Sequence, residues 1–364
     1  MMPLWLKRDY RAVSYVLCSC ILGVIFMRLV VYFAAVPVTS YGTDIAQNAM
    51  FALPTQLVFF LGIPFCIYKF YGKRTVTETL EFSSCGAFKP YFLLALPLGI
   101  AVYVLTLGIS SAWTGLLKFT GYTVSSSSTP MPEKFVFGFF AAEVALTALL
   151  PAVCEEFCMR GGLLTTARNT FKTLGCVVLC GVVFGLFHQN IRQVFYTACF
   201  GALAAFMTIK TKSLYPAMLM HFTNNFCSVF FNYASEYGWS VFGEFYTLIN
   251  GLPFWALFMV FLFAALLLTA LVVLMLYFED KRVIAKKRAA LNDAAFDATG
   301  KRVILFGEFD PERIKQLEME REVYGSGYVR ERYKPQARDI MIIVSVGVVS
   351  LLTTVFTYVW GFLY

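Results

Sequence analysis

The stretch VCEEFCMRGGLL, residues 153–164, places three charged side chains, Glu155, Glu156 and Arg160, in an otherwise apolar segment. A charged side chain near the centre of a bilayer costs about 2.5–3.5 kcal/mol on insertion scales, so each of the three needs an explanation. The residues GGLLTTA extend the segment to Arg168. If Arg168 marks the membrane boundary, Glu155 lies about 20 Å inside it, at a rise of about 1.5 Å per residue.

The composition of the whole chain indicates that this segment is one of many. Of 364 residues, 59% are hydrophobic and 14% are charged, whereas soluble domains average about 45–50% and about 25%. Several apolar runs exceed the roughly 18 residues that a transmembrane helix needs. We predict an all-α fold, a polytopic transmembrane helix bundle of about eight or nine segments. The segments are expected at residues 12–36, 51–68, 91–113, 135–168, 173–188, 194–209, 214–234, 252–278 and 340–364.

Lysine and arginine are unevenly distributed among the loops between these segments. The 37–50 and 235–251 loops have neither residue, whereas residues 69–90 have four and residues 279–338 have fourteen. Cytoplasmic loops are enriched in both residues. We therefore expect the N-terminus and residues 279–338 in the cytoplasm and the C-terminus outside, with an uncleaved first span. The net charge of +8 then reflects topology, and no nucleic-acid partner is expected.

The chain divides into five parts on this interpretation. They are N-terminal transmembrane helices (1–134), a motif-bearing membrane core (135–234), a further transmembrane helix (235–278), a charged cytoplasmic insert (279–338) and a C-terminal transmembrane helix (339–364). Asp310 and Pro311 predict the start of a short helix in the insert. The ten cysteines show no CxxC pair and are expected to be free, buried thiols. The short loops favour a prokaryotic cell membrane.

Ionisable residues inside the predicted segments are candidate functional residues. We retain Glu143, Glu155, Glu156, Arg160, His188 and His221, and the two histidines are the only ones in the chain. Taken alone, Glu143 is best explained by a position facing a water-filled cavity or by local pairing. A lone histidine is best explained by a hydrogen bond between helices. Counted from the nearest basic residues, Glu155, His188, His221 and Asn225 all lie about 14–24 Å deep, so they can meet.

Helical spacing organises the candidates further, since residues four apart share a face. Glu156 and Arg160 form such a pair and can neutralise each other, so on their own they fit a structural ion pair. His221 shares a face with Asn225, and His188 with Phe184, whose ring could wall a pocket. Two more features shape these segments: the GxxxG spacing of Gly181 and Gly185 lets another helix approach closely, and Pro151 is expected to kink or break the long fourth segment.

A carboxylate, two imidazoles and an amide at one depth suit activation of water for attack on a carbonyl. Glu155 would be the general base. One variant has Zn²⁺ bound by His188, His221 and Glu155. In another variant one imidazole assists the base while His221 and Asn225 stabilise the oxyanion. There is no HExxH motif to support zinc, and nothing specific activates Cys154 or Cys158 as a nucleophile.

The motifs EExxxR (Glu155, Glu156, Arg160), FxxxH (Phe184 to His188) and HxxxN (His221 to Asn225) occur in this order. They resemble the three motifs of the CAAX prenyl protease and bacteriocin-processing family, which are intramembrane metallo- or glutamate-dependent endopeptidases. The resemblance covers roughly residues 135–230. It implies an eight-helix core, so the insert and the ninth segment are departures.

The resemblance also implies roles. Glu155 and His188 would activate the water, His221 and Asn225 would stabilise the oxyanion or help hold metal, and Glu156 and Arg160 would orient the site. The expected substrate is a membrane-associated peptide or protein in the lipid bilayer, of the prenylated CAAX type or a bacteriocin-like peptide. Two other functions use the same residue types: a proton-coupled transporter, and a non-catalytic immunity or scaffold protein that keeps a relic site.

Overall fold

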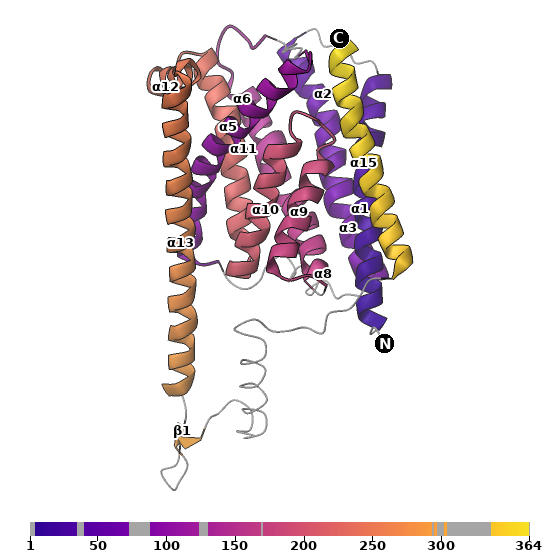
Figure 1. Cartoon of the computed structure of the whole chain (residues 1–364), viewed down its shortest axis with the longest axis vertical. Helices are drawn as coiled ribbons and strands as arrows, with labels where there is room; N and C mark the ends of the chain where they lie inside the picture. The colour runs from indigo at the N-terminus through magenta and orange to yellow at the C-terminus, as the bar shows by residue number, and fades with distance from the viewer. Residues whose placement is uncertain are drawn as a thin grey trace.

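The computed structural model describes residues 4–34, 40–72, 88–123, 130–168, 170–292, 295–296, 302–303 and 336–363. Their long helices run side by side in a bundle, with the two termini at opposite ends (Figure 1). The last turn of α13 and the N-terminus lie at the same end. The structure therefore starts the charged insert at the end of the bundle that holds the N-terminus. The helix predicted from Asp310 lies outside the described residues.

The elements follow the predicted segments in order. The N-terminal helices are α1 (Leu4–Ala34), α2 (Tyr41–Leu53), η1 (Pro54–Gly62), α3 (Ile63–Cys66), η2 (Ile67–Tyr71), η3 (Pro90–Leu94) and α5 (Ala95–Phe119). The central helices are α6 (Phe137–Glu143), η4 (Val144–Leu149), α7 (Leu150–Glu156), η5 (Phe157–Leu164), α8 (Thr165–Ala167), α9 (Thr173–Phe187), α10 (Val194–Thr211) and α11 (Tyr215–Glu236). The last are α12 (Ser240–Gly251), α13 (Phe254–Asn292), β1 (Ala295–Phe296), β2 (Arg302–Val303) and α15 (Ala337–Leu363).

The all-α, multi-pass membrane architecture is confirmed. Among the described residues, seven helices are long and apolar enough to cross a membrane, and α9 is apolar but shorter. The helix α11, which carries His221, is not among the seven, and we attribute this to its polar residues. In the part of the chain that the structure describes, the one departure from an all-α fold is the antiparallel pairing of β1 with β2, two residues each.

Three predicted boundaries are wrong. The 37–50 loop is largely the helix α2, because Ser40 and Thr43 form a capping box that starts a helix despite its polar residues. The 235–251 loop contains α12, an amphipathic helix of 12 residues that is too short to cross a membrane. The helix α13 continues beyond residue 278 as far as Asn292. For α2 and α13, hydropathy found the apolar part of a longer continuous helix and missed its polar turns, whereas α12 is a separate short helix that it missed entirely.

The fourth predicted segment is a continuous series of helical turns from α6 to α8, in which η4 and η5 are π-helical. Pro151 lies at the start of α7, directly after η4. Proline has no backbone N–H, so Pro151 cannot donate to the Thr147 carbonyl four residues earlier. The predicted disturbance at Pro151 therefore takes the form of altered helical pitch and a carbonyl without its α-helical donor.

The GxxxG prediction is confirmed where α9 packs on α10. A Cβ on Gly185 would lie 2.6 Å from the Val194 carbonyl oxygen, and one on Gly181 would lie 2.8 Å from that of Ala198. Distances this short exclude any larger residue while the backbones stay in place. The close approach fixes the end of α9, and with it His188, against the first turns of α10.

Both described ends of the charged insert are fastened to the bundle. Glu279 on α13 pairs with Lys89 at 2.8 Å and with Arg282 at 2.7 Å. At the start of α15, the carboxylate of Asp339 lies 3.6 Å from Nε of Arg11 on α1. These contacts attach α13 and α15 to different sides of the bundle (Figure 1).

Candidate active site

Glu156 lies at the centre of a buried polar group. Its Oε1 accepts a hydrogen bond from Nη1 of Arg160 at 2.9 Å and lies 2.9 Å from Nδ1 of His221. The side chains of Glu156 and Arg160 are fully buried, and that of His221 is 6% exposed. A carboxylate paired with arginine is an acceptor only, so Nδ1 of His221 carries the proton and Nε2 is its other functional atom.

Two further contacts hold Arg160. Its Nη2 donates to the Gly201 carbonyl of α10 at 3.1 Å, and its guanidinium stacks over the ring of Phe184 at 4.6 Å. Arginine has a planar fork of donors that suits such a combination. Arg160 therefore connects η5 to α9 and α10 and fixes Glu156 behind His221.

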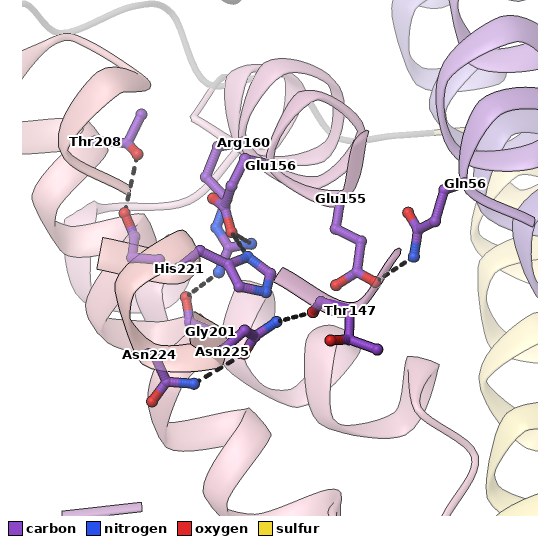
Figure 2. Close-up of polar contacts among 11 residues, drawn as sticks. Gln56, Thr147, Glu155, Glu156, Arg160, Gly201, Thr208, His221, Asn224 and Asn225 are labelled. Atoms are coloured by element: carbon purple, nitrogen blue, oxygen red, sulfur yellow. Dashed lines mark hydrogen bonds and ion pairs between the residues drawn. The ribbon is translucent and has the colours of Figure 1, made fainter. Parts of the chain in front are cut away.

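Glu155, the neighbouring carboxylate, has a different environment. Its Oε1 accepts a hydrogen bond of 2.8 Å from Nε2 of Gln56 on η1. Figure 2 shows the Glu155 carboxylate, the His221 ring and the Asn225 amide turned towards a common space. The sequence interpretation left Glu155 without a partner and missed Gln56, although an amide within the apolar segment 51–68 was a usable signal.

His188 is the residue at which α9 ends. Its Nδ1 lies 2.9 Å from the Phe184 carbonyl, and the two rings pack edge to face with centroids 5.0 Å apart. A carbonyl only accepts, so Nδ1 carries the proton and Nε2 keeps its lone pair. His188 can thus accept a proton or bind a cation through Nε2, and Phe184 walls the pocket as expected.

Asn225 is held by a chain of hydrogen bonds across α5, α11 and η4. Its Nδ2 donates to the Thr147 carbonyl, which Pro151 leaves without an α-helical donor, at 3.0 Å. Its Oδ1 accepts from Nδ2 of Asn224 at 3.0 Å (Figure 2), and Oδ1 of Asn224 accepts from Thr106 at 3.4 Å. Because the carbonyl only accepts, this chain determines the orientation of both amides.

These side chains border one cavity of about 250 Å³. It is lined by Thr106, Thr147, Pro151, Glu155, Phe184, His188, Gln193, Tyr196, Thr197, Phe200, His221, Asn224 and Asn225. Four of the six predicted site residues therefore meet at one cavity: Glu155, His188, His221 and Asn225. Glu156 and Arg160 do not line it and lie behind His221.

The remaining candidates lie elsewhere. Glu143 accepts a hydrogen bond of 2.6 Å from Tyr41 of α2, 102 residues away, and borders a second cavity. Cys158 lies 3.6 Å from Cys20, sulfur to sulfur, and neither has a hydrogen-bonded base among the described residues. The described cysteines are free, as predicted, but Cys66 and Cys199 are exposed and not buried.

The metal prediction has mixed support from the geometry. Nδ1 of each histidine is held by an acceptor, Glu156 for His221 and the Phe184 carbonyl for His188. This arrangement is typical of metal-binding histidines. Within the described part of the chain, however, no three His, Cys, Asp or Glu side chains come close enough to form a metal site. The residues as placed do not fit a three-ligand zinc centre.

Comparison with known proteins gives one match. Residues 137–227, about a quarter of the chain, match the family model described as "Type II CAAX prenyl endopeptidase Rce1-like". No curated protein and no solved structure matches the chain. The matched residues include all six predicted site residues, and neither Gln56 nor the insert falls within them. The match confirms the resemblance of the motifs: residues 137–227 of this chain are similar to the Rce1-like type II CAAX prenyl endopeptidases.

Proposed function

We propose that the chain is an intramembrane endopeptidase that hydrolyses a peptide bond by means of an activated water. The observation that carries this proposal is the cavity at which Glu155, His188, His221 and Asn225 meet. Part of its lining comes from α5, the α6–α8 series and α10, which belong to helices apolar enough to cross a membrane, and the rest comes from α9, the residues that follow it, and α11. Ionisable groups gathered at such depth carry an energetic cost that a function must justify.

Glu155 is the proposed general base. Gln56 donates to Oε1, which leaves Oε2 for a water in the cavity. The carboxylate takes a proton as the water oxygen attacks the carbonyl carbon. Nε2 of His188 has a lone pair and can accept a hydrogen bond from the same water. When the tetrahedral intermediate collapses, the C–N bond breaks and Glu155 passes its proton to the leaving amine.

Asn225 and His221 are the proposed oxyanion donors. One proton of Asn225 Nδ2 binds the Thr147 carbonyl, and the other is left for the developing negative charge. His221 can donate through Nε2 when both ring nitrogens carry a proton, and Glu156 on Nδ1 fixes the direction of the ring. Arg160 holds Glu156 in place and does not line the cavity.

Zinc remains a prediction. If substrate or a small shift brought His188, His221 and Glu155 together, Zn²⁺ would supply an acidified water and polarise the carbonyl. Metal analysis of purified protein tests this: bound zinc near one equivalent per chain in wild type, lost in the His188→Ala and His221→Ala variants, would support it. Equal metal content in all three proteins would contradict it.

The proposed substrate is a membrane-associated peptide or protein. The matched family's description names prenylated CAAX substrates, and a bacteriocin-like peptide is the other candidate. A cavity of about 250 Å³ has room for a short stretch of peptide and not for a folded domain. The proposal places the chain in a cell membrane, with the N-terminus and residues 279–338 in the cytoplasm.

The decisive experiment is cleavage by the purified chain in proteoliposomes. Wild type is expected to cleave peptides from a library of prenylated and unprenylated membrane peptides, and Glu155→Gln and His188→Ala are expected to abolish cleavage. Glu143→Gln, on the same segment but at the other cavity, is the matched control and should cleave normally. Normal turnover by the Glu155 and His188 variants would refute the proposal. Proton flux coupled to solute uptake would favour a transporter instead.

A further inference from the structure

The helix α9 is apolar but too short to cross a membrane. Its 15 residues, Thr173–Phe187, span about 22 Å at about 1.5 Å per residue, which is less than the roughly 30 Å hydrocarbon core. The backbone leaves the helix at His188, and Gln189 adopts a left-handed conformation with φ of 46°. We call residues 188–193 the His188 turn. It is non-helical backbone at a depth where water is scarce.

Such a turn needs donors for its carbonyl oxygens. The last carbonyls of any helix lack partners within the helix, and an unsatisfied one is expensive in a membrane. Arg28 of α1 supplies two: Nη2 donates to the His188 carbonyl at 3.0 Å, and Nη1 donates to the Gln189 carbonyl at 3.2 Å. Gln189 also donates from its side chain to the Ile21 carbonyl of α1.

The charge of Arg28 suits this position. No carboxylate forms an ion pair with it among the residues that the structure describes. A cation is favourable at a helix C-terminus, where the helix dipole is negative. The guanidinium fork also reaches two adjacent carbonyls at once through two separate nitrogens in fixed geometry. Arg28 thus combines a counter-charge for α9 with both hydrogen bonds.

We infer that Arg28 is a positioning residue that holds the His188 ring in the tautomer and direction needed at the cavity. Arg28 does not line the cavity, so it acts through His188. With both carbonyls satisfied, the turn keeps Nδ1 of His188 on the Phe184 carbonyl, and Nε2 stays unprotonated. Without Arg28, the two carbonyls compete for other donors, the turn shifts, and the ring loses its single orientation.

The orientation can be measured without any substrate, because the chain has only two histidines. Protein labelled with ¹⁵N-histidine gives one set of imidazole signals for each, assigned with a His188→Gln variant. Wild type should show His188 with Nδ1 protonated and Nε2 unprotonated. Arg28→Met should give mixed tautomers or broadened signals for His188, with the His221 signals unchanged. Unaltered His188 signals in Arg28→Met would overturn the inference.

A matched control is available on the same turn. Thr357 of α15 accepts a hydrogen bond at 2.9 Å from the N–H of Ile191, three residues after His188. Thr357→Val is isosteric and removes this acceptor, and it should leave the His188 signals as in wild type. If Arg28→Met does not fold, Arg28→Lys is measured in its place. Its ammonium lacks the planar fork of donors, so its His188 signals should differ from those of wild type in the direction of mixed tautomers.

Activity supplies a second readout, which rests on the proposed function. Arg28→Met should lower kcat by about 10- to 100-fold, as loss of residues that orient a reactive histidine does, with KM nearly unchanged. Wild-type kcat in Arg28→Met would overturn the inference. If wild type cleaves no peptide, the proposed protease function is contradicted. The role of Arg28 is then still tested by the ¹⁵N-histidine spectra.

Discussion

Glu156 and His221, 65 residues apart in the chain, are joined by a 2.9 Å contact between Oε1 and Nδ1. The same oxygen accepts from Arg160, so one buried atom serves both a cation and an imidazole. Glu155, the adjacent residue, instead faces the cavity and is held by a neutral amide. Two consecutive carboxylates thus have separate tasks, and this separation can be tested.

Glu156→Gln is expected to destabilise the protein far more than Glu155→Gln. Removing the charge of Glu156 leaves Arg160 fully buried without a counter-charge, which typically costs about 3–5 kcal/mol. Glu155 is only half-buried and its partner is neutral, so Glu155→Gln should change stability by no more than about 1 kcal/mol. Thermal unfolding in detergent measures both.

A double variant provides the control for this comparison. Glu156→Leu combined with Arg160→Met removes both buried charges, and it should regain part of the stability that Glu156→Gln loses. Equal unfolding midpoints for the Glu155→Gln and Glu156→Gln proteins would show that the two carboxylates do not differ as described.

Gln56→Leu should impair activity without impairing folding. Its Nε2 donates to Glu155, and a hydrogen bond to a charged group is worth about 1.5–3 kcal/mol, so kcat/KM should fall about 10- to 100-fold. Oε1 of Gln56 is buried and has no partner among the described residues, so its removal costs nothing. Thr55→Val is the control: it changes the adjacent buried residue, whose hydroxyl bonds within its own helix, and should leave kcat/KM unchanged.

Asn224→Asp should lower kcat by about tenfold. The substitution is isosteric but replaces the donor to Oδ1 of Asn225 by a second acceptor. The Asn225 amide would then turn and lose its fixed direction towards the cavity, and one hydrogen bond is worth about 1 kcal/mol or more. Asn232→Asp makes the same change on α11 at the other cavity. Similar kcat values for Asn224→Asp and Asn232→Asp would contradict a role of this hydrogen-bond chain in orienting Asn225.

Gly185→Ala should destabilise the bundle by about 1–3 kcal/mol, the usual range for overpacking. Its Cβ would meet the Val194 carbonyl oxygen at 2.6 Å and Cβ of Ala198 at 2.9 Å, and backbone cannot move aside cheaply. Gly347→Ala on α15 is the matched control, because nothing lies within 4 Å of its added Cβ. That variant should be neutral or more stable by up to about 1 kcal/mol. An unfolding midpoint for Gly185→Ala as high as that of Gly347→Ala would exclude the tight contact.

Much of the fold could be predicted from hydropathy, because each membrane segment must satisfy its backbone internally and therefore forms a helix. The pairs within one helix were equally accessible: Glu156 with Arg160 follows from a spacing of four residues. The boundaries of α2 and α12 could not be predicted in this way, since capping residues and amphipathic turns carry little hydrophobic signal.

The parts of the site that sequence reasoning missed are contacts between distant helices. Gln56 and Asn224 are neutral, so a selection for ionisable residues passes over them, although both are amides in apolar surroundings. Arg28 is charged and lies inside the first predicted segment, so the same selection applied evenly would have retained it. No local sequence pattern identifies the partners of Gln56 and Arg28. Gln56 contacts Glu155, 99 residues away, and Arg28 contacts His188, 160 residues away.

The fastening of α13 by Glu279 and of α15 by Asp339 has a consequence for how the chain is assembled. Each helix adheres to the bundle through its own ion pairs and packing, on different sides, so the peptide connection between them is not what keeps α15 in place. Two separate polypeptides, divided within residues 304–335 and expressed together, should find each other in the membrane and rebuild the site. The last helix would then behave as a separable subunit. Activity of the larger polypeptide could be measured with and without α15.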